Sequence, residues 1–287
     1  MNNLIKLIDE SLEKFLPVEY PEDLFKSMRY TVLLEGKRLR PILCLEMCRC
    51  YGGNIEAALP TACAIEMLHA QTLIHDDLPC MDNDDYRRGK PSNHKVFGEA
   101  TAVLAGDALI SWAAQVILRN SDNLSPDVKL AVLDDFLTAA GANGVIAGQV
   151  VDIEAEGHKE LHSSKMLDFI HKHKTGDLFR FAIVSGARIA GGNLEEAEEF
   201  AFNFGLAFQV ADDILDVVSD FGTMGKTLGK DAEAGKLTYV TYYGLDEAKC
   251  KLTCLLKKCD DIINKYNSKI LKEILDGIRK RVQLNVD

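Results

Sequence analysis

The sequence predicts an all-α protein, a large helical bundle that forms one domain over residues 1–287 around a central cavity. Apolar residues recur at spacings of three and four along almost the whole chain, which is typical of amphipathic helices. The chain shows neither sustained strand-like alternation nor a Pro/Gly/Ser-rich linker. Only seven residues are proline and 47% are hydrophobic, so long helices around a large core are allowed.

Four helices are expected before an acidic loop. Pro17 and Pro21 follow the first, Gly36 ends the second, and Gly52 with Gly53 closes the third, because proline and glycine interrupt helical periodicity. The expected ranges are about 4–15, 22–35, 39–51 and 55–75.

Helices are also expected after this loop. Ser125 and Pro126 are typical of an N-cap and a first helical position, and they predict a helix over 125–155. Gly191 and Gly192 end another, over 163–189. The other expected helices cover about 99–118, 194–219, 237–266 and 269–282, with a loop rich in Gly and Lys at 221–236.

The segment 69–88 concentrates five carboxylates within ten positions and two arginines directly after them. These residues are Asp76, Asp77, Asp82, Asp84, Asp85, Arg87 and Arg88. So many carboxylates repel one another unless a cation lies among them. An apolar helical run, residues 62–74, leads into the cluster, so a merely solvated acidic surface is the weaker interpretation.

A second acidic cluster lies in the sequence FQVADDILDVV. Gln209, Asp212, Asp213 and Asp216 are related by three and four positions, so they share one helix face. The opposite face is apolar and suited to a core. Clusters of oxygen ligands suit Mg²⁺, which prefers one or two carboxylates, retained waters and a substrate phosphate. The two clusters together predict a polyphosphate ligand bridged by metal.

The charge balance argues against nucleic acid as a partner, since 33 basic and 44 acidic residues give a net charge of −11. Basic residues that cluster are therefore informative. Lys37, Arg38 and Arg40 open a helix, where backbone amides also favour anions, although a solvated helix start is the alternative. Lys226 and Lys236 follow the second acidic cluster, and we expect them to neutralise diphosphate charge.

Histidine and cysteine give weaker signals. His69 lies about two turns before Asp76 and is a candidate ligand-binding residue, although a satisfied buried histidine fits equally well. His171 and His173 lie about 200° apart on a helix, so they cannot bind one ion there. The eight cysteines contain no C-x-x-C pair, which argues against a zinc site. The N-terminal residues contain no signal peptide or membrane span, so we expect a cytoplasmic protein without stable membrane insertion.

The motifs DDLPCMD with RRG, and DDILD, together with GKRLRP, KTG, FQ and GKTLGKD, resemble those of the short-chain trans-isoprenyl diphosphate synthases. The resemblance runs from Lys37 to about Lys236 and includes both acidic motifs in order. It implies the isoprenoid synthase fold, usually a homodimer, with the two aspartate motifs across the mouth of a deep cavity. It also implies a prenyltransferase of isoprene biosynthesis that joins isopentenyl diphosphate head to tail to dimethylallyl and geranyl diphosphate.

The resemblance assigns roles to individual residues. The implied ligands of Mg²⁺, about three ions with substrate bound, are Asp76, Asp77, Asp82, Asp212, Asp213 and Asp216. The implied isopentenyl diphosphate site is Lys37, Arg40, His69 and Arg88. The implied allylic diphosphate site is Arg87, Lys174, Thr175, Gln209, Lys226 and Lys236. Of these, Lys174, Thr175 and Gln209 would stabilise the carbocation that forms when the allylic C–O bond ionises.

The resemblance also implies that product length depends on the residues before the first aspartate, here Ala70 and Gln71. Position 71 lies about 7–8 Å below Asp76 along the helix. Many bacterial farnesyl diphosphate synthases carry tyrosine at that position, and LPCMDNDD also resembles plastid geranylgeranyl diphosphate synthases. We expect the 15-carbon farnesyl diphosphate, as in a bacterial geranyltranstransferase, because compact bacterial-type chains of this length usually make it. The 20-carbon geranylgeranyl diphosphate is the alternative.

Three other classes fit less well. A class I terpene cyclase shares the first acidic motif but usually carries an Asn/Ser/Glu-type second motif in place of DDILD. A catalytically silent partner subunit tends to lose one aspartate motif, and both are intact. A ferritin-like di-iron bundle needs Glu-x-x-His motifs, which do not occur.

Overall fold

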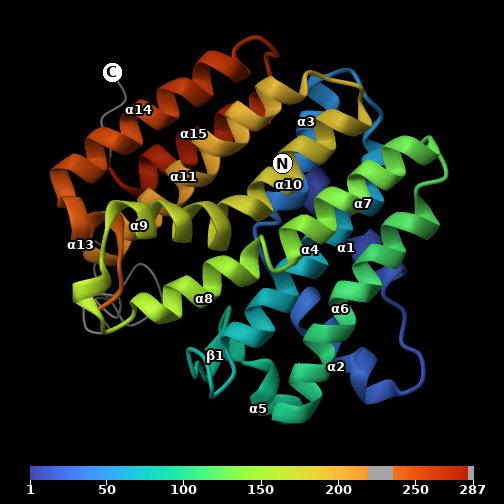
Figure 1. Cartoon of the computed structure of the whole chain (residues 1–287). Helices are drawn as coiled ribbons and strands as arrows, with labels where there is room; N and C mark the ends of the chain where they lie inside the picture. The colour runs from blue at the N-terminus through green and yellow to red at the C-terminus, as the bar shows by residue number, and fades with distance from the viewer. Residues whose placement is uncertain (219–234, 284–287) are drawn as a thin grey trace. The chain divides into compact units, whose positions relative to one another are not determined.

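The computed structural model describes residues 1–218 and 235–283, which are almost entirely helical (Figure 1). The predicted all-α fold class is therefore confirmed. Contacts group the residues into two compact units. Unit 1 comprises Met1–Leu137 and Ser185–Gly192, and unit 2 comprises Thr138–Val184 and Asn193–Asp287. The expected single domain over residues 1–287 stays a prediction.

Unit 1 is built around one long buried helix, α4 (Ile55–Asp76), whose N-cap Asn54 accepts a hydrogen bond from the Glu56 amide. Helices α1, α2, α3 and α6 all pack against α4 (Figure 1). The helices around it are α1 (Asn2–Phe15), α2 (Glu22–Val32), α3 (Leu39–Cys50), α5 (Asn93–Phe97) and α6 (Glu99–Asn120). This packing buries α4 over most of its length. The buried helix therefore fixes the position of the first aspartate motif at its C-terminal end.

Unit 2 is built around α11 (Leu194–Val218), which packs against α14, α15 and η2. Its core includes Phe200 and Phe204, and the latter meets Phe179 with ring centroids 5.2 Å apart. The other elements are α8 (Val145–Ala155), η1 (Lys159–Leu161), α9 (Ser164–Ile170), η2 (His171–Gly176), α13 (Tyr239–Tyr243), α14 (Leu245–Ile263) and α15 (Lys269–Arg281). Helices α7 (Pro126–Ala140) and α10 (Asp177–Ile189) each contribute residues to both units.

Three predicted helices are wrong in their continuity. The helix expected over 125–155 is divided into α7 and α8 by residues 141–144. Gly141 and Asn143-Gly144 are typical turn residues, but the apolar periodicity on both sides of them favoured one continuous helix in the prediction. The helix expected over 163–189 contains the π-helical turn η2. The helix expected over 237–266 is divided at Gly244, whose φ of +89° is unfavourable for other residues.

The expectation of no sheet is also wrong locally, because a two-stranded hairpin follows the first aspartate motif. Strand β1 (Tyr86–Arg87) pairs antiparallel with β2 (Lys90–Pro91). Arg88 and Gly89 form the turn with φ of +53° and +76°, the conformation of a type I′ hairpin turn. An Arg-Gly turn gives a weaker sequence signal than Asn-Gly, and each strand is too short to show alternation.

Two stretches are long and apolar enough to cross a membrane by length and composition alone, namely Glu99–Asn120 and Pro126–Ala155, the second of which is divided into α7 and α8 at residues 141–144. In each, 39% of the most apolar window is buried within the protein. Core helices of soluble proteins meet the same criterion, so these stretches are weak indicators of a membrane span.

Candidate active site

The first aspartate motif forms a tight loop at the C-terminal end of α4. The Asp82 amide donates a hydrogen bond to the Asp76 carbonyl at 2.9 Å, and the Asn83 amide donates to the Leu78 carbonyl at 3.1 Å. These bonds return the chain to the end of the helix. As a result, the backbones of Asp76 and Asp82, the two principal predicted metal ligands in this motif, lie next to each other.

Asp77 is held inside unit 1. It is buried and accepts hydrogen bonds from Arg87, whose Nε lies 2.9 Å from Oδ1. Burial raises the pKa of this carboxyl group, and the hydrogen bond from Arg87 opposes the rise. Arg87 also lies within 3.5 Å of Asp84. The structure thus places Arg87, predicted to bind allylic diphosphate, in a contact that secures the aspartate loop to the hairpin.

Two of the predicted isopentenyl diphosphate residues, Arg40 and Arg88, lie close enough to His69 to influence its charge. Burial holds the pKa of this histidine well below its ordinary value, and the positive charges of Arg40, Arg88, Arg87 and Arg38 lower it further. His69 is therefore neutral at physiological pH and offers one N–H donor to an anion. Lys37, directly before Arg38, is exposed. This concentration of cations without a metal suits a diphosphate group.

The predicted chain-length residues are buried on α4, about one and a half turns before Asp76. Ala70 is 3% and Gln71 7% exposed. The Gln71 amide hydrogen-bonds to Nδ1 of His75 at 3.1 Å, and Nε2 of His75 lies 3.1 Å from the Val103 carbonyl of α6. A Cβ atom at Gly106 would lie 2.0 Å from that imidazole, so α6 approaches closely. The Gln71 and His75 side chains therefore pack at the interface between α4 and α6.

The second aspartate motif lies on α11 as the periodicity predicts, yet its members differ in environment. Asp213 is 3% exposed and accepts hydrogen bonds from the Gln209 amide at 2.9 Å and the Tyr239 backbone amide at 2.7 Å. The Asp212 side chain is 44% exposed and lies 3.2 Å from Arg281. Asp216 is partly exposed. Asp212 and Asp216 can thus reach a ligand, whereas Asp213 braces α11 against the start of α13.

The predicted catalytic residues come together on and beside η2. Thr175 donates a hydrogen bond to the Gln209 side-chain oxygen at 2.6 Å, and Lys174 pairs with Asp152 of α8 at 2.5 Å. A π-helical turn displaces carbonyls from their usual partners, and such turns are frequent at functional sites. The Lys174 and Thr175 carbonyls, expected to stabilise a carbocation, lie in this turn.

Two residues of this site were missed by sequence reasoning. Asp152 was detectable as a single carboxylate in the apolar run 145–153. His171 was considered only as a metal ligand, although it is 4% exposed and its Nε2 lies 3.4 Å from Asp213. Its imidazole also stacks on Tyr239. Only the tertiary fold reveals that His171 supports the second aspartate motif.

The remaining predicted residues are Lys226, which lies outside the described residues, and Lys236, which is partly buried just before α13. Within residues 1–218 and 235–283, no three His, Cys, Asp or Glu side chains converge to hold a metal ion by themselves. The exposed carboxylates of each motif instead fit a hard cation that shares its ligands with a substrate phosphate.

Comparison with known proteins gives a consistent assignment. The polyprenyl synthetase family model matches residues 21–276. A dimethylallyltranstransferase of Fischerella ambigua is 45% identical over 92% of this chain and 77% of its own. A geranylgeranyl diphosphate synthase of Cyanophora paradoxa is 41% identical over 93% and 89%. The structure of an FPP/GFPP synthase from Zymomonas mobilis matches with a TM-score of 0.85, 33% identity and 96% coverage of both chains. The chain therefore belongs to the polyprenyl synthetase family and is a short-chain trans-prenyltransferase.

Proposed function

We propose that this protein extends allylic diphosphates by condensation with isopentenyl diphosphate, and that it needs Mg²⁺. The observation that supports this most strongly is that the chain carries two aspartate motifs and, separately from both, a group of arginine side chains around His69. A terpene cyclase would need only the first diphosphate site. A second cationic subsite is useful only to an enzyme that holds two diphosphates at once.

Different residues are proposed to bind each of the two substrates. Lys37, Arg40, His69 and Arg88 would bind the diphosphate of isopentenyl diphosphate. Asp76, Asp82 and Asp212 would hold Mg²⁺, which supplies positive charge to the leaving allylic diphosphate. The carbonyls of η2 and the Gln209 side chain, fixed by Thr175, would face the developing carbocation with their negative dipole ends. We assign the final proton to the departing diphosphate, since none of the site residues named above is proposed as a base.

We propose geranylgeranyl diphosphate as the main product, in place of the 15-carbon product expected from chain length. Gln71 leaves more room than a tyrosine beneath the first aspartate motif, and the relative from Cyanophora paradoxa is named a geranylgeranyl diphosphate synthase. Farnesyl diphosphate is the second candidate, since the similar structure from Zymomonas mobilis is named an FPP/GFPP synthase.

The direct test is incubation of the purified protein with Mg²⁺, labelled isopentenyl diphosphate and, in turn, dimethylallyl and geranyl diphosphate. Chromatography of the dephosphorylated products then gives their chain lengths. Accumulation of 20-carbon product would support the proposal, whereas elongation that stops at 15 carbons would favour the second candidate. Release of diphosphate with a cyclic hydrocarbon would overturn the prenyltransferase function.

Gln71→Tyr is expected to move the products from 20 towards 15 carbons, because the larger ring would fill space below Asp76. The control is Gln71→Met, which removes the hydrogen bond to His75 with little change in volume and should leave the product length unchanged. The measurement is the product distribution at equal conversion. Unchanged lengths in Gln71→Tyr would show that position 71 does not limit elongation.

We also propose that the protein is a homodimer. Large apolar side chains are exposed on α6 and α7 of unit 1, namely Val103, Leu104, Leu118, Leu130 and Leu137. Exposed apolar surface is covered when proteins associate, and the resemblance to homodimeric enzymes makes a second copy the expected partner. Light scattering should give about twice the 31.7 kDa of one chain. Leu104→Glu should shift the mass towards the monomer, while Val18→Glu, exposed before α2, should not.

A further inference from the structure

We propose that Glu66 is a positioning residue for the isopentenyl diphosphate subsite, in which its carboxylate fixes the Arg38 and Arg88 guanidinium groups. Through them it fixes the segments on either side of the subsite, residues 33–38 and the hairpin turn at Arg88. The inference rests on the proposed prenyltransferase function and adds a residue that the predicted binding sets do not contain.

Glu66 lies at the centre of this arrangement. It sits on α4 three residues before His69, and it is 3% exposed. Its Oε1 accepts a hydrogen bond from Nη1 of Arg38 at 2.7 Å and lies 3.7 Å from Nη2 of Arg88. One carboxylate oxygen thus lies between two guanidinium groups. A buried charge is retained only when it is paired, so these contacts account for the presence of Glu66 inside α4.

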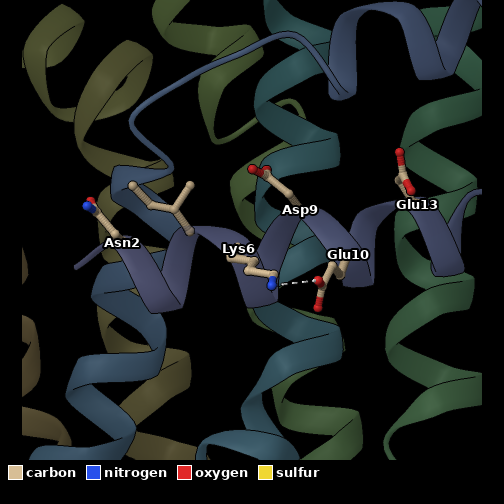
Figure 2. A pocket seen from close by; sticks show the side chains of 6 residues that line it. Asn2, Lys6, Asp9, Glu10 and Glu13 are labelled. Carbon is tan, nitrogen blue, oxygen red and sulfur yellow. Dashed lines mark ion pairs between the residues drawn. The ribbon is translucent and has the colours of Figure 1, made fainter.

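Arg38 is fully engaged in the protein and is not available to a ligand. Besides Glu66, it donates to Asp9 Oδ1 at 2.7 Å, to the Val32 carbonyl at 3.0 Å and to the Leu34 carbonyl at 3.0 Å. Figure 2 shows Asp9 on α1 with its carboxylate directed away from the neighbouring Lys6–Glu10 ion pair. Arg38 therefore connects α1 and the end of α2 to α4, and Glu66 is its contact on α4.

Arg88 lies flat against the same segment. Its Nη1 donates to the Leu34 carbonyl at 3.3 Å, and a Cβ atom at Gly36 would lie only 2.6 Å from that nitrogen. Arg38 and Arg88 also both have left-handed backbones, with φ of +46° and +53°. Non-glycine residues keep this conformation only where surrounding contacts hold them. The shared contact with Glu66 provides such a constraint for both arginines.

The electrostatics support the same role. Burial lowers the pKa of Arg88, and the negative charge of Glu66 opposes this effect while Arg38 adds to it. Without Glu66, the Arg38 and Arg88 charges would repel each other inside unit 1. Glu66 offsets part of the positive charge of Arg38 and Arg88, and the predicted diphosphate-binding cations remain Lys37, Arg40 and Arg88.

Glu66→Gln tests this role, because glutamine keeps the size of the side chain and removes its charge. We expect the KM for isopentenyl diphosphate to rise about tenfold, with smaller changes in kcat and in the KM for the allylic substrate. The matched control is Glu46→Gln on α3, since Glu46 is 2% exposed and pairs with Arg49 at 2.7 Å. The control should leave both KM values near those of the wild type.

Gly36→Ala displaces the Arg88 guanidinium by a route that changes no buried charge. The added methyl group meets the flexible end of that side chain, and Gly36 does not have a left-handed backbone, so the variant should fold normally. It should reproduce the selective rise in KM. Since both substitutions act through Arg88, the double variant should show less than the product of the two effects.

The outcomes separate the role of Glu66 from the function itself. No elongation by the wild-type protein would overturn the proposed function and this role with it. If the wild type is active but Glu66→Gln leaves the KM for isopentenyl diphosphate unchanged, the role of Glu66 is refuted and the proposed function is not. The role would also be refuted if the KM values for both substrates rose equally, since that would indicate a general structural defect.

Discussion

Asp212→Asn is expected to lower kcat for elongation by about a thousandfold, because a metal ion contributes several kcal/mol of charge stabilisation and each 1.36 kcal/mol corresponds to a factor of ten. Asp212 is half-exposed within the predicted ligand stripe, where it can reach a cation. Asparagine keeps the shape of the side chain but removes the charge. The measurement is initial elongation rate with geranyl and isopentenyl diphosphate over a range of Mg²⁺ concentrations.

Two comparisons make this result specific. Asp261→Asn changes an exposed aspartate of α14 outside the motif and should leave the rate unchanged. Raising Mg²⁺ should recover part of the lost rate in Asp212→Asn, because the remaining ligands bind the ion more weakly. A variant that keeps its rate within tenfold of the wild type at all Mg²⁺ concentrations would show that Asp212 is not a principal metal ligand.

The chemistry of the site could be predicted from the sequence where it depends on residue type and local spacing. The stripe of Gln209, Asp212 and Asp216 follows from helix geometry alone. Lys37 and Arg40 belong to a cluster of basic residues at a predicted helix start, and His69 lies about two helical turns before Asp76. These predictions needed no knowledge of the tertiary structure.

Differences within one motif could not be predicted, because they arise from segments distant in the sequence. Periodicity gives Asp212 and Asp213 similar positions, yet the backbone amide of Tyr239 meets Asp213 and buries it. In the same way, the sequence shows Glu66 only as a single carboxylate within the apolar run 62–74. Its contact with Arg38 joins residues 28 positions apart. Burial and charge pairing of this kind require the folded structure.

The position of the π-helical turn η2 could not be predicted from the sequence for the same reason, because tertiary contacts determine it. Nothing in the periodicity of the segment 171–176 distinguishes a π-helical turn from an α-helix. Within unit 2 the turn packs against α8, α9 and α11. Its conformation is therefore set by tertiary packing, and the contact with α8 depends on a glycine.

Gly148→Ala is expected to destabilise the protein by about 1–3 kcal/mol, the usual effect of added bulk in a packed interior. A Cβ atom at position 148 would lie 2.1 Å from the Lys174 backbone nitrogen and 2.7 Å from the His173 carbonyl carbon. These are backbone atoms, which cannot rotate away as a side chain does. Helix α8 must therefore separate from η2, and kcat should fall at least about tenfold as Lys174 and Thr175 move.

Gly277→Ala on α15 is the matched control, since nothing lies within 4 Å of the added methyl group. Because alanine is about 1 kcal/mol more favourable than glycine inside a helix, this variant should be slightly more stable than the wild type and equally active. Thermal unfolding and elongation rates measured on both variants give the comparison. If Gly148→Ala kept the wild-type kcat, the position of η2 against α8 would not matter for catalysis, and its carbonyls would lose their proposed role. If Gly148→Ala lowers the stability of the protein and Gly277→Ala raises it, the contact of position 148 with η2 determines the loss of stability, and the general difference between glycine and alanine does not.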